Sequence, residues 1–96
     1  MTEELNQKLK KYFSLTREAL EKVKVKENLD KESKKKALEL LNLSKSYYED
    51  AKHFEKQGNL LNAYGAVCYA HSFLDSGAIL GLFDVDDDRL FMVDRR

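Results

Sequence analysis

Residues 60–80 read LLNAYGAVCYAHSFLDSGAIL, and the arrangement of the whole chain follows from this stretch. Apolar or small side chains occupy almost every side of a helix with this sequence, which has one carboxylate, Asp75, and one imidazole, His71. A helix that is apolar nearly all round is buried between other elements. The stretch therefore predicts a central helix that packs between two other helices or against a second subunit.

The residues before this stretch predict a tight helical hairpin. Gly58 suits the left-handed position that follows a helix, and Asn59 can cap the helix that comes next. Upstream, apolar or small residues recur every three or four positions and predict a helix from about residue 31 to 57. Its buried face is expected to comprise Ala37, Leu38, Leu41, Ser44, Tyr48, Ala51 and Phe54.

A further amphipathic helix is predicted at the start of the chain, from residue 2 to about 25. Thr2 is its expected N-cap, and Glu3 and Glu4 lie where the helix dipole favours negative charge. The pattern stops between residues 24 and 31, where Asp30 is expected to cap the second helix. The buried face of the first helix is expected to comprise Leu5, Leu9, Tyr12, Thr16, Ala19 and Val23.

Three long helices joined by short loops predict an all-α, up-and-down antiparallel three-helix bundle, because consecutive helices must run in opposite directions. Residues 81–96 differ, since their apolar residues alternate around an Asp86–Asp88 turn and predict an extended or hairpin-like C-terminal arm. Gly77 interrupts the third helix, so we expect the backbone of this arm to approach it closely. Phe83 or Phe91 is expected to cover the bundle.

Length and composition restrict the classes of function. The 96 residues fit a single helical-bundle domain, residues 1–96, with little room for an enclosed active site. Residues 1–56 hold 14 basic and 11 acidic groups (net +3), and residues 57–96 hold 3 and 6 (net −3). A dedicated nucleic-acid binder usually has a stronger basic balance. The lone Cys68 and the lack of a long apolar run predict a cytoplasmic protein with no membrane span.

Two stretches of the chain resemble a known family. They are the run YYEDAKHF at residues 47–54 and the run YAHSFLDSGAILGLF at residues 69–83, with Gly58-Asn59 between them. Together they resemble the archaeal domain-of-unknown-function family 357. The resemblance implies a small three-helix bundle with no established activity. It also implies an accessory role, because longer archaeal chains carry such a module beside a nucleotidyltransferase-like domain.

The tyrosines are the first candidate binding residues. Tyr47, Tyr48, Tyr64 and Tyr69 are expected to cluster where the second and third helices meet, with Asp50 one turn away. Tyrosine combines a large contact area with a polar tip, which suits an interface. The same spacing is also typical of residues at the rim of a bundle core, so both interpretations remain open.

His71 and Asp75 are the second candidates. They lie four residues apart, so they share one side of the third helix and can form an imidazole–carboxylate pair. As a general acid and base the pair would make a hydrolase, which is a minor alternative. The favoured interpretation is structural, with Asp75 accepting a hydrogen bond from an amide of the arm. No catalytic residue is therefore assigned.

The sequence lacks recognisable metal, cofactor and nucleophile motifs. The four aspartates within residues 84–88 have neither the glycine nor the distal glutamate of a calcium loop. Ser72 and Ser76 lie in a helix, without the strand-to-helix turn that exposes a reactive serine. The remaining potential ligands do not match a zinc spacing; they are His53, Cys68, His71 and Asp75. We therefore predict no metal, no cofactor and no enzymatic activity.

These features predict a non-enzymatic interaction module that self-associates or docks to a protein partner. The third helix carries this prediction, because it is more apolar than burial against two neighbouring helices requires. The alternative is an accessory RNA- or nucleotide-binding module. In that case the basic first half would contact phosphates, while Tyr47 and Tyr48 would stack on bases.

Overall fold

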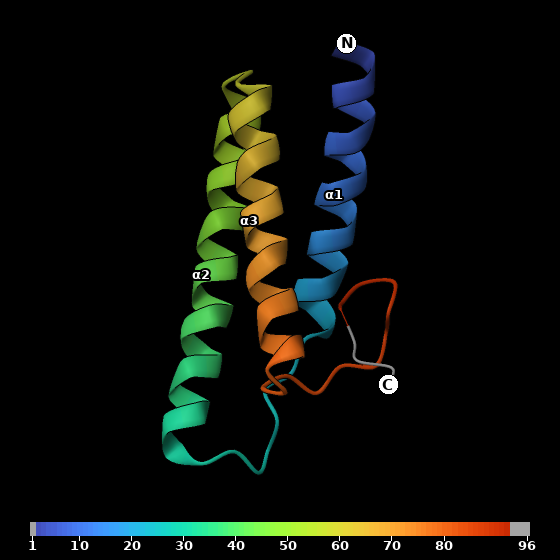
Figure 1. The fold of residues 1–96 in the computed structure, drawn as a ribbon. Helices are drawn as coiled ribbons and strands as arrows, with labels where there is room; N and C mark the ends of the chain where they lie inside the picture. The colour runs from blue at the N-terminus through green and yellow to red at the C-terminus, as the bar shows by residue number, and fades with distance from the viewer. Residues whose placement is uncertain (1, 93–96) are drawn as a thin grey trace.

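The chain folds into three long helices, of which the most apolar one lies in the middle. The computed structural model describes residues 2–92. Helix α1 spans Thr2–Lys22, α2 spans Lys31–Lys56 and α3 spans Leu60–Ile79. The helices run in alternating directions, and α3 packs against both α1 and α2 (Figure 1). The predicted all-α, up-and-down bundle with a central third helix is confirmed.

Four capping signals were predicted, and one of them, Thr2 as an N-cap, is wrong because Thr2 already lies inside α1. Asp30 is the N-cap of α2, and its carboxylate accepts a hydrogen bond from the Ser33 amide at 2.7 Å. Gly58 has a φ of 77°, the left-handed conformation predicted after α2. Asn59 takes the predicted N-cap position of α3, but its side chain makes no capping hydrogen bond. Its ψ of 77° departs from the extended geometry of a capping residue.

The first helix is shorter than predicted, because it ends at Lys22 and not near residue 25. The backbone that would continue the helix bonds to the C-terminal arm instead. The Asp84 amide donates to the Lys24 carbonyl at 2.7 Å, and the Lys26 amide donates to the Leu82 carbonyl at 3.0 Å. Tertiary pairing with the arm has therefore replaced the last turn of α1.

Residues 81–92 form an arm that folds back beside the C-terminal ends of α1 and α3 (Figure 1). Of the two predicted forms, the described residues show the extended arm and no hairpin. The arm makes one isolated antiparallel bridge, between Phe83 and Val25. Farther along, the Leu90 amide donates to the Asp87 carbonyl at 3.1 Å and closes a turn. The last predicted arm residues, 93–96, lie outside the described part.

Gly77 is buried under the arm, and the predicted approach of the arm backbone is confirmed, because the Leu82 amide donates to the Gly77 carbonyl at 2.9 Å. A side chain approaches the same residue from the side of its missing Cβ. The ring of Phe83 occupies the place where a Cβ of residue 77 would stand. The expectation that Phe83 or Phe91 covers the bundle is confirmed, since their exposed fractions are 2% and 4%. The contact between the Phe83 ring and Gly77 thus fixes the arm to α3.

The core consists of two apolar clusters with buried polar groups between them. The Ser44 hydroxyl, from α2, donates to the Ala70 carbonyl of α3 at 2.7 Å, and the buried Thr16 of α1 bonds to the His71 ring. One cluster joins the arm to the bundle and contains Ala19, Ala37, Leu74, Leu82, Phe83, Leu90 and Phe91. The other lies toward the start of α3 and contains Leu9, Ala51, Ala63, Ala66 and Val67.

The Asp30 cap makes stability sensitive to acid. The Ser33 amide and hydroxyl lower the pKa of Asp30 below its ordinary value of about 3.9. This stabilisation is complete above that value and is lost as the pH falls through the lower pKa of the folded state. We expect Asp30→Asn, which keeps a capping oxygen, to flatten the dependence of urea midpoints on pH between about 5 and 2. An unchanged pH profile would contradict this role of Asp30.

Candidate functional site

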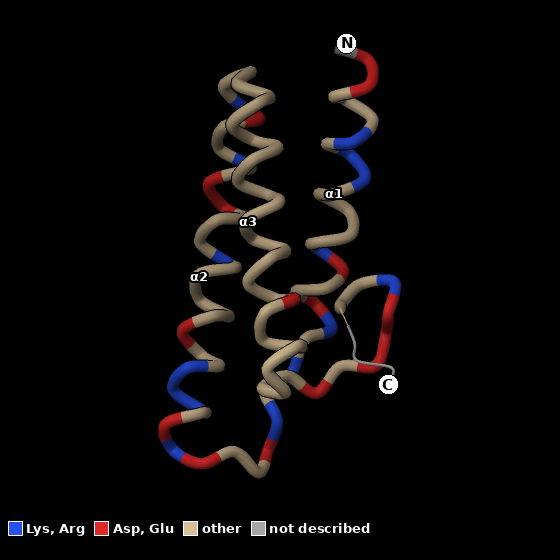
Figure 2. Tube along the Cα trace, viewed as in Figure 1, with Lys and Arg blue, Asp and Glu red and all other residues tan. Residues whose placement is uncertain are grey.

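One side of α3 is exposed and uncharged from end to end. We call six exposed residues on this side the outer stripe: Leu61, Gly65, Tyr69, Ser72, Ser76 and Leu80. The large ones are well exposed, with 73% for Leu61, 61% for Tyr69 and 67% for Leu80. Figure 2 shows α3 in tan except for one red segment, which is Asp75. Charged residues are 35% of the chain, so the outer stripe contrasts with the rest of the surface.

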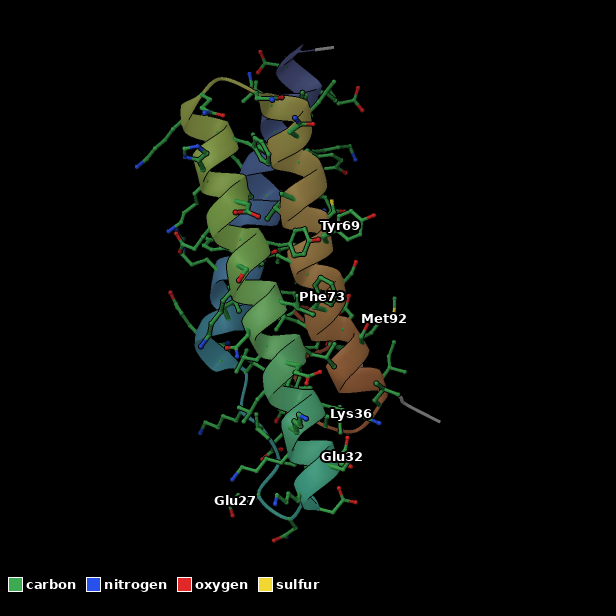
Figure 3. All side chains as sticks on the ribbon, turned by 90° about the vertical axis from the view of Figure 1, so that its left-hand side faces the viewer. Glu27, Glu32, Lys36, Tyr69, Phe73 and Met92 are labelled. Carbon is green, nitrogen blue, oxygen red and sulfur yellow. The ribbon has the colours of Figure 1, made fainter. Side chains whose placement is uncertain are left out.

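An aromatic cluster borders the outer stripe where α3 meets α2. The Tyr47 ring of α2 stacks on the Tyr69 ring with centroids 5.5 Å apart, and it lies at the same centroid distance from Phe73. In Figure 3, Tyr69, Phe73 and Met92 follow one another along α3. Met92, from the arm, is 60% exposed and extends the apolar surface. Asp50 is exposed on α2, one turn beyond Tyr47.

The four predicted tyrosines do not form one cluster. Only Tyr47 and Tyr69 meet between α2 and α3. Tyr48 packs edge-on against Phe13 of α1, and Tyr64 packs edge-on against Tyr12 of α1, each at a centroid distance of 5.7 Å. Tyr47 and Tyr48 are therefore neighbours in sequence whose rings belong to different contacts of the bundle.

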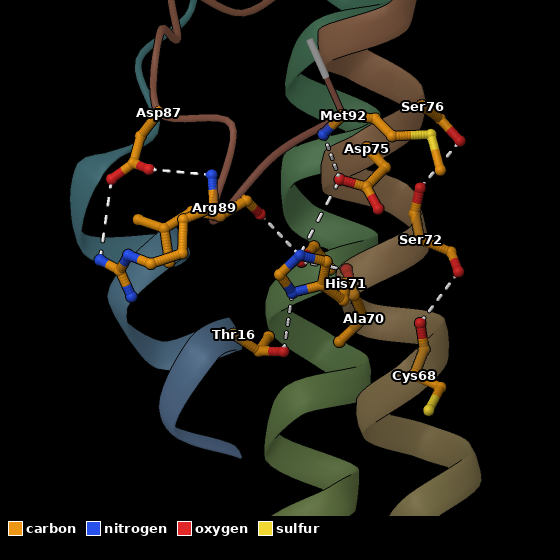
Figure 4. A network of polar contacts seen from close by, with 12 residues as sticks. Thr16, Cys68, Ala70, His71, Ser72, Asp75, Ser76, Asp87, Arg89 and Met92 are labelled. Atoms are coloured by element: carbon orange, nitrogen blue, oxygen red, sulfur yellow. Dashed lines mark hydrogen bonds and ion pairs between the residues drawn. The ribbon is translucent and has the colours of Figure 1, made fainter. Parts of the chain in front are cut away.

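His71 connects α1, α3 and the arm (Figure 4). Its Nε2 lies 2.7 Å from the Leu90 carbonyl oxygen, and its Nδ1 lies 3.0 Å from the Thr16 hydroxyl oxygen. A carbonyl oxygen only accepts, so Nε2 carries the proton, and in a neutral ring Nδ1 accepts from the hydroxyl. Both ring nitrogens are thus bonded within the protein.

Asp75 bonds to the arm, as the sequence predicted. Its Oδ1 accepts a hydrogen bond from the Met92 amide at 2.9 Å. The same oxygen lies 3.9 Å from His71 Nε2, so the predicted imidazole–carboxylate pair is close but secondary to two contacts with the arm. His71 and Asp75 hold Leu90 and Met92 against α3, and Figure 4 shows the Met92 side chain extending from there toward Ser76.

Replacing Asp75 by alanine is expected to loosen the arm. The Met92 amide would lose its acceptor, which costs about 1–3 kcal/mol for a buried group. The loss should be near the lower limit because the Asp75 side chain is 24% exposed. Thermal unfolding and hydrogen exchange of the Met92 amide measure the effect. Asp75→Asn keeps an acceptor oxygen and serves as the matched control. Equal stability of Asp75→Ala and the wild type would contradict the structural role.

The nucleophilic side chains of α3 are engaged or protonated. The Ser72 hydroxyl donates to the Cys68 carbonyl at 2.9 Å, and the Ser76 hydroxyl donates to the Ser72 carbonyl at 2.8 Å. Burial raises the pKa of the Cys68 thiol, which keeps it in the unreactive form. Among residues 2–92, no three His, Cys, Asp or Glu side chains converge in a geometry that could hold a metal ion.

The acidic turn of the arm is tied to α1 by cations. Burial raises the pKa of Asp87. The Arg89 amide at 3.0 Å and the Arg89 and Lys22 cations lower the pKa by more than burial raises it, so the pKa of Asp87 is below its ordinary value. Lys22 Nζ lies 3.5 Å from Asp87 Oδ2. Arg89 also donates to both carboxylate oxygens of Glu18, at 2.9 and 2.6 Å. This turn is an anchoring contact of the arm.

Sequence reasoning missed two of these contacts. Thr16 was assigned to the buried face of the first helix without a partner. A hydroxyl at a core position indicates that a buried group bonds to it, so the sequence did contain a signal for a partner of Thr16. The pair of Glu18 and Arg89 joins residues 71 positions apart and leaves no local signal.

Comparison with known proteins gives one result. The family model described as "Protein of unknown function (DUF357)" matches residues 11–83. No curated protein and no solved structure matches the chain. Within the described residues, none of the helices is long and apolar enough to cross a membrane. The matched residues include both stretches in which the sequence resembled this family, α2 and α3 entire, and the start of the arm. The chain belongs to the DUF357 family of proteins of unknown function.

Proposed function

We propose that this protein is a non-enzymatic interaction module that binds another protein surface through the outer stripe and the adjoining aromatic cluster. One observation carries the proposal: α3 and its C-cap residue expose Leu61, Tyr69 and Leu80 by 61–73% on a side without charge. Exposed large apolar residues and tyrosine on one side of a helix are typical of interfaces. Tyr47, Phe73 and Met92 extend this area beyond the helix itself.

The contacts of His71 support a protein without catalytic activity. A general base must be able to take up a proton from a substrate, whereas the two nitrogens of His71 bond to Leu90 and Thr16. The hydroxyls of Ser72 and Ser76 are bonded to backbone carbonyls. A hydrolase built on His71 and Asp75 would have to break contacts that fix the arm.

The RNA- or nucleotide-binding alternative has less support. It needs Tyr47 and Tyr48 as a common stacking platform, but their rings contact different elements. The basic residues of α1 are spread along the helix, and acidic residues lie among them and among those at the start of α2 (Figure 2). Salt-dependent RNA binding at low ionic strength would revive this alternative. The archaeal source and the cytoplasmic location remain predictions.

Site-specific photocrosslinking in cells of the native source tests the proposal. A photoreactive phenylalanine analogue at Tyr69 should give discrete protein adducts whose components mass spectrometry identifies. The same group at Lys10, an exposed residue of α1, is the control and should give none of them. Absence of adducts at Tyr69, or identical adducts at both positions, would overturn the proposal.

A further inference from the structure

We infer that the outer stripe binds the outer stripe of a second copy of this chain, with the two α3 helices antiparallel. This inference rests on the proposed function and names the partner of that same surface. It follows from three features of α3: the symmetry of the stripe, the space around Gly65 and the lack of charged side chains in its first and last turns.

The outer stripe is symmetric about the point between Ala70 and His71. Its members form three pairs at equal distances from that point: Leu61 with Leu80, Gly65 with Ser76, and Tyr69 with Ser72. An antiparallel second copy would therefore set each residue against its pair-mate. Large residues would meet at both ends, small residues would meet between them, and each tyrosine would lie over a serine near the two-fold axis. Such a surface satisfies the requirement of an isologous dimer, in which one patch complements itself.

The small members of the stripe permit a second helix to approach closely. A Cβ built at Gly65 would have no neighbouring atom within 4 Å, so this position is open in the free chain. The hydroxyls of Ser72 and Ser76 already donate to carbonyls of α3 itself. A second helix can thus pack here without leaving these donors unpaired.

The ends of α3 favour the antiparallel orientation. α1 and α2 carry acidic residues in their first turns and basic residues in their last turns. α3 has neither, so its own side chains do not compensate its dipole. In an antiparallel pair, the positive end of each α3 lies beside the negative end of the other. A parallel pair would bring like ends together.

The size of the surface predicts a weak dimer. The 20 residues of α3 form a helix about 30 Å long, and a contact strip about 10 Å wide gives on the order of 300 Å² per copy. Tyr47 and Met92 lie beside the stripe and add to this area. Two stripes together would bury about 600 Å², which is below the roughly 1,000 Å² of a stable specific interface, so we expect a weak dimer with a dissociation constant in the high micromolar range or above.

Sedimentation velocity over a range of concentrations tests the contact. In the proposed dimer the Gly65→Leu side chain blocks close packing of the two helices, so we expect the dissociation constant to rise at least tenfold. Nonspecific association would change in the opposite direction, because the variant adds apolar surface. Ser14→Leu adds the same side chain at an exposed position of α1 and should leave the constant unchanged. Circular dichroism verifies that both variants are folded. A wild-type dimer that is insensitive to Gly65→Leu would overturn the inference.

A charge pair tests the orientation. Gly65→Lys and Ser76→Glu should each weaken the dimer at least tenfold. The double variant should recover most of the loss, because each lysine then faces a glutamate of the other copy. Within one chain these positions are about 16 Å apart along the helix and cannot pair. Failure of the double variant to recover would exclude the antiparallel arrangement.

The outcomes separate this inference from the proposed function. A wild-type chain that stays monomeric at millimolar concentration, together with a Tyr69 crosslink to a different protein, would overturn the dimer and support the interaction module. A monomer without any crosslink at Tyr69 would overturn both.

Discussion

Replacing Phe83 by alanine is expected to lower the free energy of unfolding by about 3–5 kcal/mol, the usual range for a buried phenylalanine. The Phe83 side chain is 2% exposed and packs in the cluster that joins the arm to the three helices. A small domain is stable by only about 5–15 kcal/mol, so this loss would be a large fraction of the total. Urea unfolding followed by circular dichroism at low temperature would measure it.

Phe83→Leu is the matched control, because leucine retains much of the apolar volume and should cost less, about 1–2 kcal/mol. Hydrogen exchange would separate loss of the arm from loss of the bundle. If Phe83 acts through the arm, the amides of Asp84 and Lys26 should lose protection first. A loss below about 1 kcal/mol for Phe83→Ala would contradict the tight contact with Gly77.

The contact with Gly77 can be isolated by a double-mutant cycle. In the wild type, Gly77→Ala should destabilise by about 1–3 kcal/mol, because the new methyl group overlaps the Phe83 ring. In the Phe83→Ala background the space is vacant, and the higher helix propensity of alanine should make the same change stabilising by about 0.5–1 kcal/mol. The sign reversal identifies the ring as the reason for a glycine here. The same sign in both backgrounds would contradict that reason.

The helices were predictable because their signals are local. Apolar spacing, Asp30 and Gly58 each act within one or two turns of the helix that they define, and the predicted ends of α2 and α3 agree with the structure to within one residue. The C-terminal end of α1 was not predictable in this way. It depends on pairing of Lys24 and Lys26 with the arm, about 60 residues away, which leaves no trace in the local pattern.

The sequence predicted the contacts of the arm more accurately than the path of its backbone. Gly77 indicated a close approach, and Asp75 indicated a hydrogen bond with an arm amide; both contacts are present. The sequence did not indicate that the Phe83 ring would also approach Gly77, because this depends on the path of the chain between Gly81 and Phe83. The path of the backbone cannot be predicted from a pattern of alternating apolar residues.

The sequence predicted the residue types of the candidate site but not which of these residues lie together. The apolar character of α3 indicated excess surface, but periodicity alone did not separate Tyr47 and Tyr69 from Tyr48 and Tyr64. That separation depends on the placement of α1, whose Tyr12 and Phe13 take up the latter two rings. The outer stripe became visible only once the buried sides of α3 were known.

Replacing His71 by alanine is expected to cost about 2–4 kcal/mol, because it removes two hydrogen bonds at once and leaves the buried Thr16 hydroxyl and the Leu90 carbonyl without the ring. His71→Gln can still donate to Leu90 and should cost less. Chemical denaturation of both variants gives the difference. A stable His71→Ala variant that had lost binding at the outer stripe would instead indicate a functional role for the ring.

A second cycle decides whether Thr16 acts through His71. Thr16→Val removes the hydroxyl with little change in shape, and in the wild type it should cost about 1 kcal/mol because His71 Nδ1 loses its donor. In the His71→Ala background the hydroxyl is already unpaired, so the same change should be neutral or stabilising. Additive losses in the double variant would mean that the two residues act separately. Strong coupling would instead show that the hydroxyl of Thr16 in α1 acts through the His71 ring of α3, whose other nitrogen bonds to Leu90 of the arm.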